Sequence, residues 1–248
     1  NPHVQFLGMQ APENNPIEFK KNLIPPDKLI HKGIFNPDLN GYYYTISDTG
    51  FQQFDVYMIE WLKGTWSKPQ KAFFNSDFSA HGMSFSPDGN TLYFRSTRPT
   101  QIEGIADTWH IWRSEKVNET WTEPAYVDIP NMRTKLTSHP TITHSGKLYF
   151  HGSDLDYSNM NIYHSQLLDG KFQAATEVQI AQKPQTGTCT PFVSPYGDFL
   201  IFAAIENQLD LYIAFNTGDG TWSKAQKLSK EINTLGQGNP YVTPDNKF

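Results

Sequence analysis

The sequence of 248 residues predicts an all-β chain made of a unit that repeats about every 50 residues. Aromatic side chains mark the period: Trp66, Trp121, Phe172 and Trp222 follow one another at intervals of 55, 51 and 50 residues. Each of them comes after several short apolar runs joined by tight turns, and no segment has a helical period of adequate length. A repeat of this length with several strands is typical of a β-propeller, in which each unit forms one blade.

The first strand of each unit is recognised by the turn that ends it. Five apolar strands run into a Pro-Asp or similar turn, where proline and glycine set the backbone angles. These turns occupy residues 35–38, 85–89, 142–146, 193–197 and 242–245. The repeats therefore begin near residues 31, 81, 138, 189 and 238, and the fifth stops before its second and third strands.

The second unit shows the strands of a blade most clearly. Strands are expected at residues 82–85, 91–95, 109–113 and 126–129. The second strand recurs at 42–44, 148–150 and 200–202, and the third at 55–57, 161–163 and 210–212. Each complete unit is thus expected to form a four-stranded antiparallel blade.

The ends of the chain are expected to complete the last blade together. Propellers close by pairing strands from the two termini, and residues 16–19 have the pattern of an outermost strand. We therefore predict a single domain over residues 1–248. It is a five-bladed β-propeller in which residues 1–30 form a closing segment and the last blade is incomplete in this chain.

The second repeat resembles a known family of propeller repeats. Residues 85–99 read Phe-Ser-Pro-Asp-Gly-Asn-Thr-Leu-Tyr-Phe-Arg-Ser-Thr-Arg-Pro, which is similar to the TolB-like repeat, the Pro-Asp variety of the WD-type propellers. The resemblance covers roughly residues 31–248, and the third repeat departs from it at His144-Ser145. It implies the propeller fold. Its members include translocation accessories, peptidase gating domains and polysaccharide lyases, so the fold leaves the function open.

Composition excludes some partners and indicates a compartment. The net charge is −5 with no long run of one sign, which argues against nucleic-acid binding. No stretch approaches the roughly 18 apolar residues that a membrane span needs. The single cysteine, Cys189, rules out an internal disulfide. Because the sequence starts at Asn1-Pro2 rather than Met, we expect that a leader was removed and that the protein is periplasmic or secreted.

Blade topology predicts where a functional site would lie. Residues just before the first strand and just after the second emerge at the same end of the central channel in every blade. Four of the eight histidines fall at these positions, together with basic and acidic side chains. The candidates are His31, His81, His139, His151, Arg95, Arg98 and Asp154.

This collection of side chains favours an acidic sugar as the substrate. Arginine binds carboxylates, and histidine moves protons near neutral pH, which is what β-elimination beside a uronate carboxylate requires. We predict that His81, His139 and His151 are catalytic, and that His31, Arg95, Arg98 and Asp154 bind the substrate. The TolB-like resemblance further implies a divalent metal ion. Its ligands would come from His31, His81, His139 and His151.

Other functions fit the same residues. A non-catalytic propeller could bind a protein, a peptide or a glycan at this end of the channel. A glycosidase could use Asp48, Asp154 and Glu206, although loop carboxylates more often cap turns. A histidine at a strand end is also commonly a structural residue, and a structural role in the loop before Pro99 is the alternative to substrate binding for Arg98. We favour a lyase or dehydratase acting on acidic oligosaccharides over these alternatives.

Overall fold

The computed structural model describes residues 5–9, 15–19, 23–234 and 236–245, and their strands form four antiparallel sheets. The first sheet contains β1 (Lys28–Phe35), β2 (Gly41–Asp48), β3 (Phe54–Leu62), β4 (Thr65–Trp66) and β5 (Gln70–Lys71). The second contains β6 (Ala80–Phe85), β7 (Thr91–Ser96), β8 (His110–Val117), β9 (Thr120–Trp121) and β10 (Ala125–Tyr126). The third contains β11 (Leu136–Ile142), β12 (Lys147–Ser153), β13 (Asn161–Leu168), β14 (Lys171–Phe172) and β15 (Thr176–Glu177). The fourth contains β16 (Thr188–Val193), β17 (Phe199–Ile205), β18 (Leu209–Phe215) and β19 (Gln226–Lys227).

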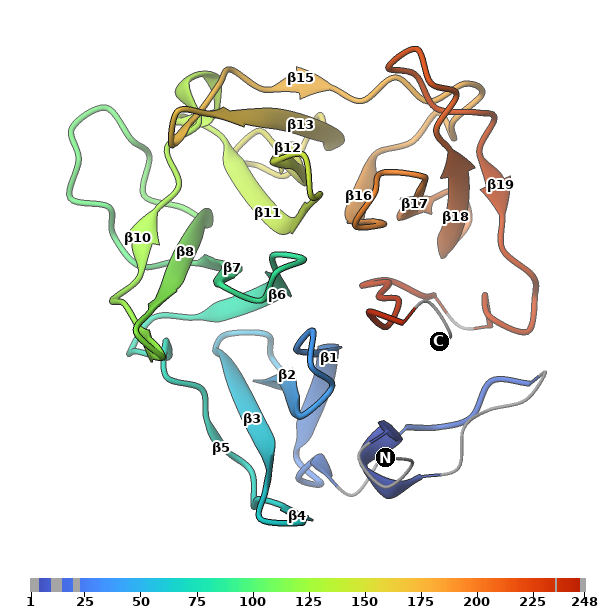
Figure 1. Ribbon diagram of the computed structural model, residues 1–248. Helices are drawn as coiled ribbons and strands as arrows, with labels where there is room; N and C mark the ends of the chain where they lie inside the picture. Colours follow the sequence, from blue (N-terminus) through green and yellow to red (C-terminus); the bar gives the residue numbers. More distant parts are fainter. Residues whose placement is uncertain (1–4, 10–14, 20–22, 235, 246–248) are drawn as a thin grey trace.

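The four sheets follow one another around a common centre, as the blades of a propeller do (Figure 1). In each blade the first three long strands are neighbours in chain order, and β1, β6, β11 and β16 lie innermost (Figure 1). Within the described residues, helical structure is limited to short 3₁₀ turns such as η1 (Gln5–Gly8) and η3 (Pro130–Met132). In the described part of the chain, no helix has the length and apolar character that crossing a membrane requires.

Apolar cores between neighbouring blades hold the propeller together. The core between the first and second blades includes Val56 and Phe94, both fully buried. The core between the third and fourth blades includes Phe202 and Trp222. Trp222 is 3% exposed and packs edge-to-face on Tyr149 of the third blade. The aromatic residues that define the sequence period therefore stabilise the contacts between blades, as expected.

The prediction of a fifth blade is wrong for the described residues, because the fifth repeat forms no sheet. Residues 236–245 contain no strand, and neither do residues 15–19, where an outermost strand was expected. Residues 20–22 and 246–248 lie outside the described residues. A β-strand forms only beside another strand with which it shares a ladder of backbone hydrogen bonds. In the described part of the chain, no strand pairs with the fifth repeat in this way.

The fifth repeat nevertheless keeps the local conformation of an innermost strand. Asn239 has a positive φ of 56°, just as the equivalent residues of the second, third and fourth repeats have positive φ values, and Thr243 Oγ1 donates to Asp245 Oδ1 at 2.7 Å in its turn. The Tyr241 hydroxyl accepts from the amide of Phe35 at 3.1 Å and donates to its carbonyl at 3.2 Å. Tyr241 also packs edge-to-face on Phe192 of the fourth blade.

Segments near both ends of the chain fill the space between the fourth and first blades (Figure 1). Leu7 is buried there in one apolar cluster with Phe35 and Tyr42 of the first blade. Phe19 packs edge-to-face on the rings of Phe35 and Tyr42, and Tyr241 joins the same cluster. The two ends of the chain thus close the propeller by side-chain packing instead of by the shared sheet that we expected.

Candidate functional site

A β-bulge near the start of each innermost strand shapes one end of the channel. The strand register shifts between Ile30 and Gly33, His81 and Ser84, Ser138 and Thr141, and Cys189 and Phe192. At these bulges Gly82, His139 and Thr190 take φ values of 62°, 51° and 45°. Such a conformation is unfavourable for His139 and especially for the β-branched Thr190. Bulges redirect side chains and are frequent beside active sites, so this end of the channel is a candidate for the active site.

The bulged strands bring the four predicted histidines of the channel end into one group. The ring centroids of His31 and His81 lie 5.3 Å apart, those of His81 and His139 4.9 Å, and those of His139 and His151 5.1 Å. We call these four residues the histidine group. His81, His139 and His151 are only 3–4% exposed, whereas His31 is half-buried. The group therefore reaches solvent on the side of His31.

Two cationic side chains lie beside the histidine group. Arg95 of β7 donates from Nη1 to Ser138 Oγ at 2.9 Å, and its guanidinium stands 4.0 Å from the ring centroid of Trp109. Burial lowers the pKa of Arg95 to about 10. Lys32 is 1% exposed, and burial lowers its pKa to about 8. Among the described residues, no carboxylate forms an ion pair with either cation.

Backbone amides fix the position of the proton on two of the histidines. The amide of Gly82 donates to Nδ1 of His81 at 2.6 Å, and the amide of Thr190 donates to Nδ1 of His151 at 3.1 Å. A backbone N–H can only donate, so Nδ1 is the acceptor in both rings. A neutral imidazole then carries its proton on Nε2. Both rings therefore present an Nε2–H donor.

Ser138 joins Arg95 to His139. Its Oγ accepts from Arg95 Nη1 at 2.9 Å and is hydrogen-bonded to Nδ1 of His139 at 2.8 Å, and the tautomer of His139 sets the direction of this second bond, because a hydroxyl oxygen can accept twice. When Ser138 donates to Nδ1, His139 carries its proton on Nε2, as His81 and His151 do. Both Nε2 of His139 and Nε of Arg95 are buried without a hydrogen-bond partner among the described residues. Buried donors of this kind are costly unless a ligand or water satisfies them.

The histidines stay neutral at physiological pH because they are buried beside cations. Burial, followed by the charge of Arg95, holds the pKa of His81 well below its usual value. The pKa of His151 falls to about 3 for the same reasons. Burial, followed by the proximity of His81, keeps the pKa of His139 low as well. The charges that lower these three pKa values belong to Arg95, Lys32 and the neighbouring histidines.

The chemistry of the group suits an anion better than a metal ion. It offers N–H donors and two buried cations, which is the environment that a carboxylate, sulfate or phosphate prefers. A divalent cation needs an unprotonated ring nitrogen, which the hydrogen bonds to Nδ1 withhold, and Arg95 and Lys32 would repel it. Within the described residues, no three or more His, Cys, Asp or Glu side chains are arranged to hold a metal ion. The residues present therefore do not fit the metal site that the resemblance implied.

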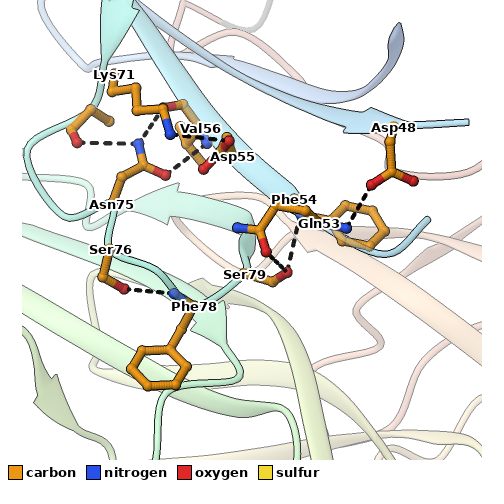
Figure 2. Close-up of polar contacts among 11 residues, drawn as sticks. Asp48, Gln53, Phe54, Asp55, Val56, Lys71, Asn75, Ser76, Phe78 and Ser79 are labelled. Carbon is orange, nitrogen blue, oxygen red and sulfur yellow. Dashed lines mark hydrogen bonds and ion pairs between the residues drawn. The ribbon is translucent and has the colours of Figure 1, made fainter. Parts of the chain in front are cut away.

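An aromatic side chain supports the group from the first blade. The Phe54 ring stacks on His81 with centroids 5.3 Å apart and an interplanar angle of 6°. The Phe54 amide donates to Ser79 Oγ at 3.1 Å, and the neighbouring Gln53 amide donates to Asp48 Oδ2 at 2.9 Å (Figure 2). These bonds fix the loop between β2 and β3 at the point where it places Phe54 under His81.

Two predicted substrate-binding residues make their contacts elsewhere. Arg98 donates from Nη2 to the carbonyl of Phe74 at 2.9 Å and stands over the ring of Trp112 at 5.2 Å. Asp154 accepts from Lys135 Nζ at 2.6 Å and caps its own loop. Neither side chain is among the contacts of the histidine group. The prediction that they share its site is corrected, because each is held by partners in its own loop or between two blades.

The carboxylates proposed for a glycosidase serve loops of different blades. Asp48 accepts from the amides of Gly50 and Gln52 at 2.8 and 3.0 Å. Glu206 accepts from the hydroxyl of Tyr212 at 2.8 Å. Asp154 pairs with a lysine, as described above. Capping of loops accounts for all three, which removes the support for a pair of catalytic carboxylates.

Sequence reasoning missed several residues of the site. Lys32 was visible as the counterpart of His139 in the first repeat, but its burial was not. Ser138 occupies the position of His31 and His81 in the third repeat, but its contact with Arg95 could not be predicted from that position. Trp109, which lies under the Arg95 guanidinium, was expected only as a strand residue. Exposed aromatic residues also border the site: Phe51 is 57% exposed and packs on His31 with centroids 5.8 Å apart. Tyr157 is equally exposed and lies within electrostatic range of Arg95.

Neither a family model nor a curated protein matches the chain. Among solved structures, it is similar to a 6-phosphogluconolactonase-like protein from Bacteroides uniformis at 14% identity and a TM-score of 0.47, covering 87% of this chain and 60% of that one. An oligogalacturonate lyase from Vibrio parahaemolyticus matches at 12% identity and a TM-score of 0.47, with coverages of 90% and 62%. An oligogalacturonate lyase in complex with manganese matches at 13% identity and a TM-score of 0.48, with coverages of 90% and 62%.

The chain thus spans less than two thirds of the length of each of these propeller-like enzymes. At such identities and TM-scores, none of these similarities bears on the activity of this protein, which has to be argued from its own residues.

Proposed function

We propose that the protein acts on acidic oligosaccharides at the histidine group, where it breaks a glycosidic bond beside a uronate carboxylate by β-elimination. One observation carries the proposal: buried N–H donors and two buried cations lie together with no acidic partner among the described residues. Uncompensated buried cations are costly, and a bound carboxylate supplies the missing charge.

The donors act as an electrostatic clamp on the reacting group. Arg95 and the Nε2–H groups of His139 and His151 bind the substrate carboxylate. When the proton on the adjacent carbon leaves, negative charge spreads onto this carboxylate, and the same donors bind it more strongly. They are already fixed by Ser138 and by backbone amides, so little reorganisation is needed during the reaction.

Lys32 serves as the base. His81 and His151 carry their proton on Nε2, so neither ring can accept a second proton there and remain neutral, and burial beside cations keeps the pKa of all three buried histidines low. A buried lysine with a pKa of about 8 is partly unprotonated near neutral pH. The role proposed for the histidines thus changes from base to donor.

The elimination breaks one C–H bond and one C–O bond of the uronate and forms one C=C double bond. Lys32 Nζ takes the proton from C5 of the uronate, and the electron pair of that C–H bond becomes the C4=C5 double bond. The C4–O bond breaks, and its electron pair stays with the leaving oxygen. The ammonium group formed on Lys32 gives its extra proton to this oxygen, which restores the free amine, while His81 stays neutral and offers its Nε2–H as a hydrogen-bond donor. The products are an unsaturated uronate and a shortened saccharide.

Exposed aromatic residues provide a place for the rest of the saccharide. Phe51 and Tyr157 are each 57% exposed; Phe51 packs on His31, and Tyr157 lies within electrostatic range of Arg95. Sugar rings pack their C–H faces on aromatic rings of this kind. A saccharide can therefore rest on this surface while only one carboxylate contacts the buried donors.

The test uses oligogalacturonate and follows the ultraviolet absorbance of the unsaturated product. We expect Lys32→Met to lower kcat by about a hundredfold or more with little change in KM, and Arg95→Met to raise KM. Arg98→Met is the matched control, since Arg98 makes its contacts elsewhere, and it should behave as the wild type. In the wild type, kcat/KM should rise with pH through about 8 as Lys32 loses its proton.

Two results separate the proposal from its alternatives. Binding of oligogalacturonate without a change in absorbance would establish a non-catalytic binding propeller instead of a lyase. The same oligosaccharide with its carboxylates reduced to alcohols tests the anion site, because it should not bind. Equal binding of the charged and the reduced saccharides would refute the role of the donors.

A further inference from the structure

A pocket of about 200 Å³ lies at the other end of the channel. Its lining residues come from the ends of the innermost strands and from the turns that follow them. The histidine group, in contrast, lies near the beginning of these strands. Ser84, which lines this pocket, lies three residues along β6 from His81, so the two sites are roughly 10 Å apart. The apolar part of the lining includes Phe35, Phe85, Ile142, Phe192 and Val242.

One hydroxyl group in this pocket is free for a ligand. Ser84, Thr141, Phe192 and Tyr241 occupy the same position in successive repeats, and all four line the pocket. Ser84 is 8% exposed, and its Oγ has no hydrogen-bond partner among the described residues. The Tyr241 hydroxyl, in contrast, is engaged by Phe35. A buried hydroxyl without a partner costs free energy that a ligand can recover.

The remaining lining sets the charge and shape of the ligand. No Lys, Arg, Asp or Glu side chain is part of it. At its edge the rings of His144 and Tyr196 are in contact, with centroids 4.7 Å apart, and Tyr196 is 77% exposed. Apolar walls with a few polar groups are the usual composition of a small-molecule site. The ligand that fits is neutral, compact and ring-shaped.

We propose that this pocket binds a neutral molecule in which an aromatic ring carries one hydroxyl group. The aromatic ring packs between the apolar side chains of the pocket, and the hydroxyl group forms a hydrogen bond with Ser84 Oγ. This binding site is separate from the histidine group and does not depend on the function proposed there.

The test compares 2-naphthol with naphthalene, which has the same rings but no hydroxyl, by calorimetric titration of the whole chain. We expect the wild type to bind 2-naphthol about tenfold more tightly. Ser84→Ala should abolish this preference by weakening only the binding of 2-naphthol. Because Ser84 Oγ makes no bond in the free protein, Ser84→Ala should melt at the same temperature as the wild type or higher. Ser229→Ala, at an exposed position, is the matched control.

A second variant tests the location of the site without disturbing the fold. Tyr196→Ala removes a mostly exposed ring from the edge of the pocket and should weaken the binding of both probes. Oligogalacturonate should not compete with 2-naphthol, since it is expected at the other end of the channel. The proposal is overturned if neither probe binds, if the wild type binds both equally, or if Ser84→Ala keeps the preference.

Discussion

Replacing Lys32 by Met should stabilise the protein while removing the proposed base. Burial lowers the pKa of this lysine from 10.5 to about 8, which corresponds to about 3 kcal/mol of unfavourable free energy for its charged form. Methionine has a similar length and no charge, and Lys32 has no ion pair within the described residues that the change would break. Near pH 7 we therefore expect Lys32→Met to raise the free energy of unfolding by up to about 3 kcal/mol.

The pH dependence of this difference identifies its cause. Between about pH 8 and 10.5 the unfolded chain keeps the lysine proton that the folded protein loses, so the wild type becomes more stable as the pH rises. Lys32→Met has no proton to lose and lacks this gain. The difference between the two proteins should shrink from about 3 kcal/mol below pH 8 to almost nothing at about pH 10.5.

Urea unfolding followed by tryptophan fluorescence, once near neutral pH and once near pH 10, measures both quantities. Lys68→Met, at an exposed position, is the control and should change stability by less than about 0.5 kcal/mol at either pH. A less stable Lys32→Met near neutral pH, or a difference that does not vary with pH, would refute the view that Lys32 is an uncompensated buried cation.

Two further predictions concern the packing of the propeller. Tyr241→Phe should lower the free energy of unfolding by about 1–3 kcal/mol, because it leaves the amide and carbonyl of Phe35 without a partner; Tyr196→Phe, on an exposed ring, should have almost no effect in the same urea titration. Trp222→Ala should cost about 3–5 kcal/mol, since it opens a cavity between the third and fourth blades. A stable Trp222→Ala would mean that the periodic aromatic residues do not hold neighbouring blades together.

Much of the blade architecture could be predicted because turn chemistry and side-chain alternation are local properties. The strand expected at residues 91–95 corresponds to β7 (Thr91–Ser96), and the one at 82–85 lies within β6 (Ala80–Phe85). The number of blades could not be obtained in this way. Residues 16–19 and 238–245 have the pattern of strands, but a pattern does not show whether a hydrogen-bonding neighbour is present.

The convergence of the histidines could also be predicted, since equivalent positions of successive blades lie at the same end of the channel. The contacts of Arg98 and Asp154 could not be predicted, because both residues lie in loops, and the conformation of a loop does not follow the sequence repeat from blade to blade. The positions of the protons on the histidine rings could not be predicted from the sequence either. They depend on individual contacts, such as that of the Thr190 amide with His151, which form only once the bulged strands stand side by side.

The contact between Tyr241 and Phe35 has a consequence for the order of folding. These residues are 206 positions apart in the chain, whereas the strands within a blade are joined by short turns. Bringing together residues so distant costs roughly 3 kcal/mol more chain entropy than closing a five-residue turn. Individual blades should therefore form early, and joining of the chain ends should be the last step, limited by a slow search. Until that step is complete, apolar side chains of the first and fourth blades that the end segments cover remain exposed to association with another chain.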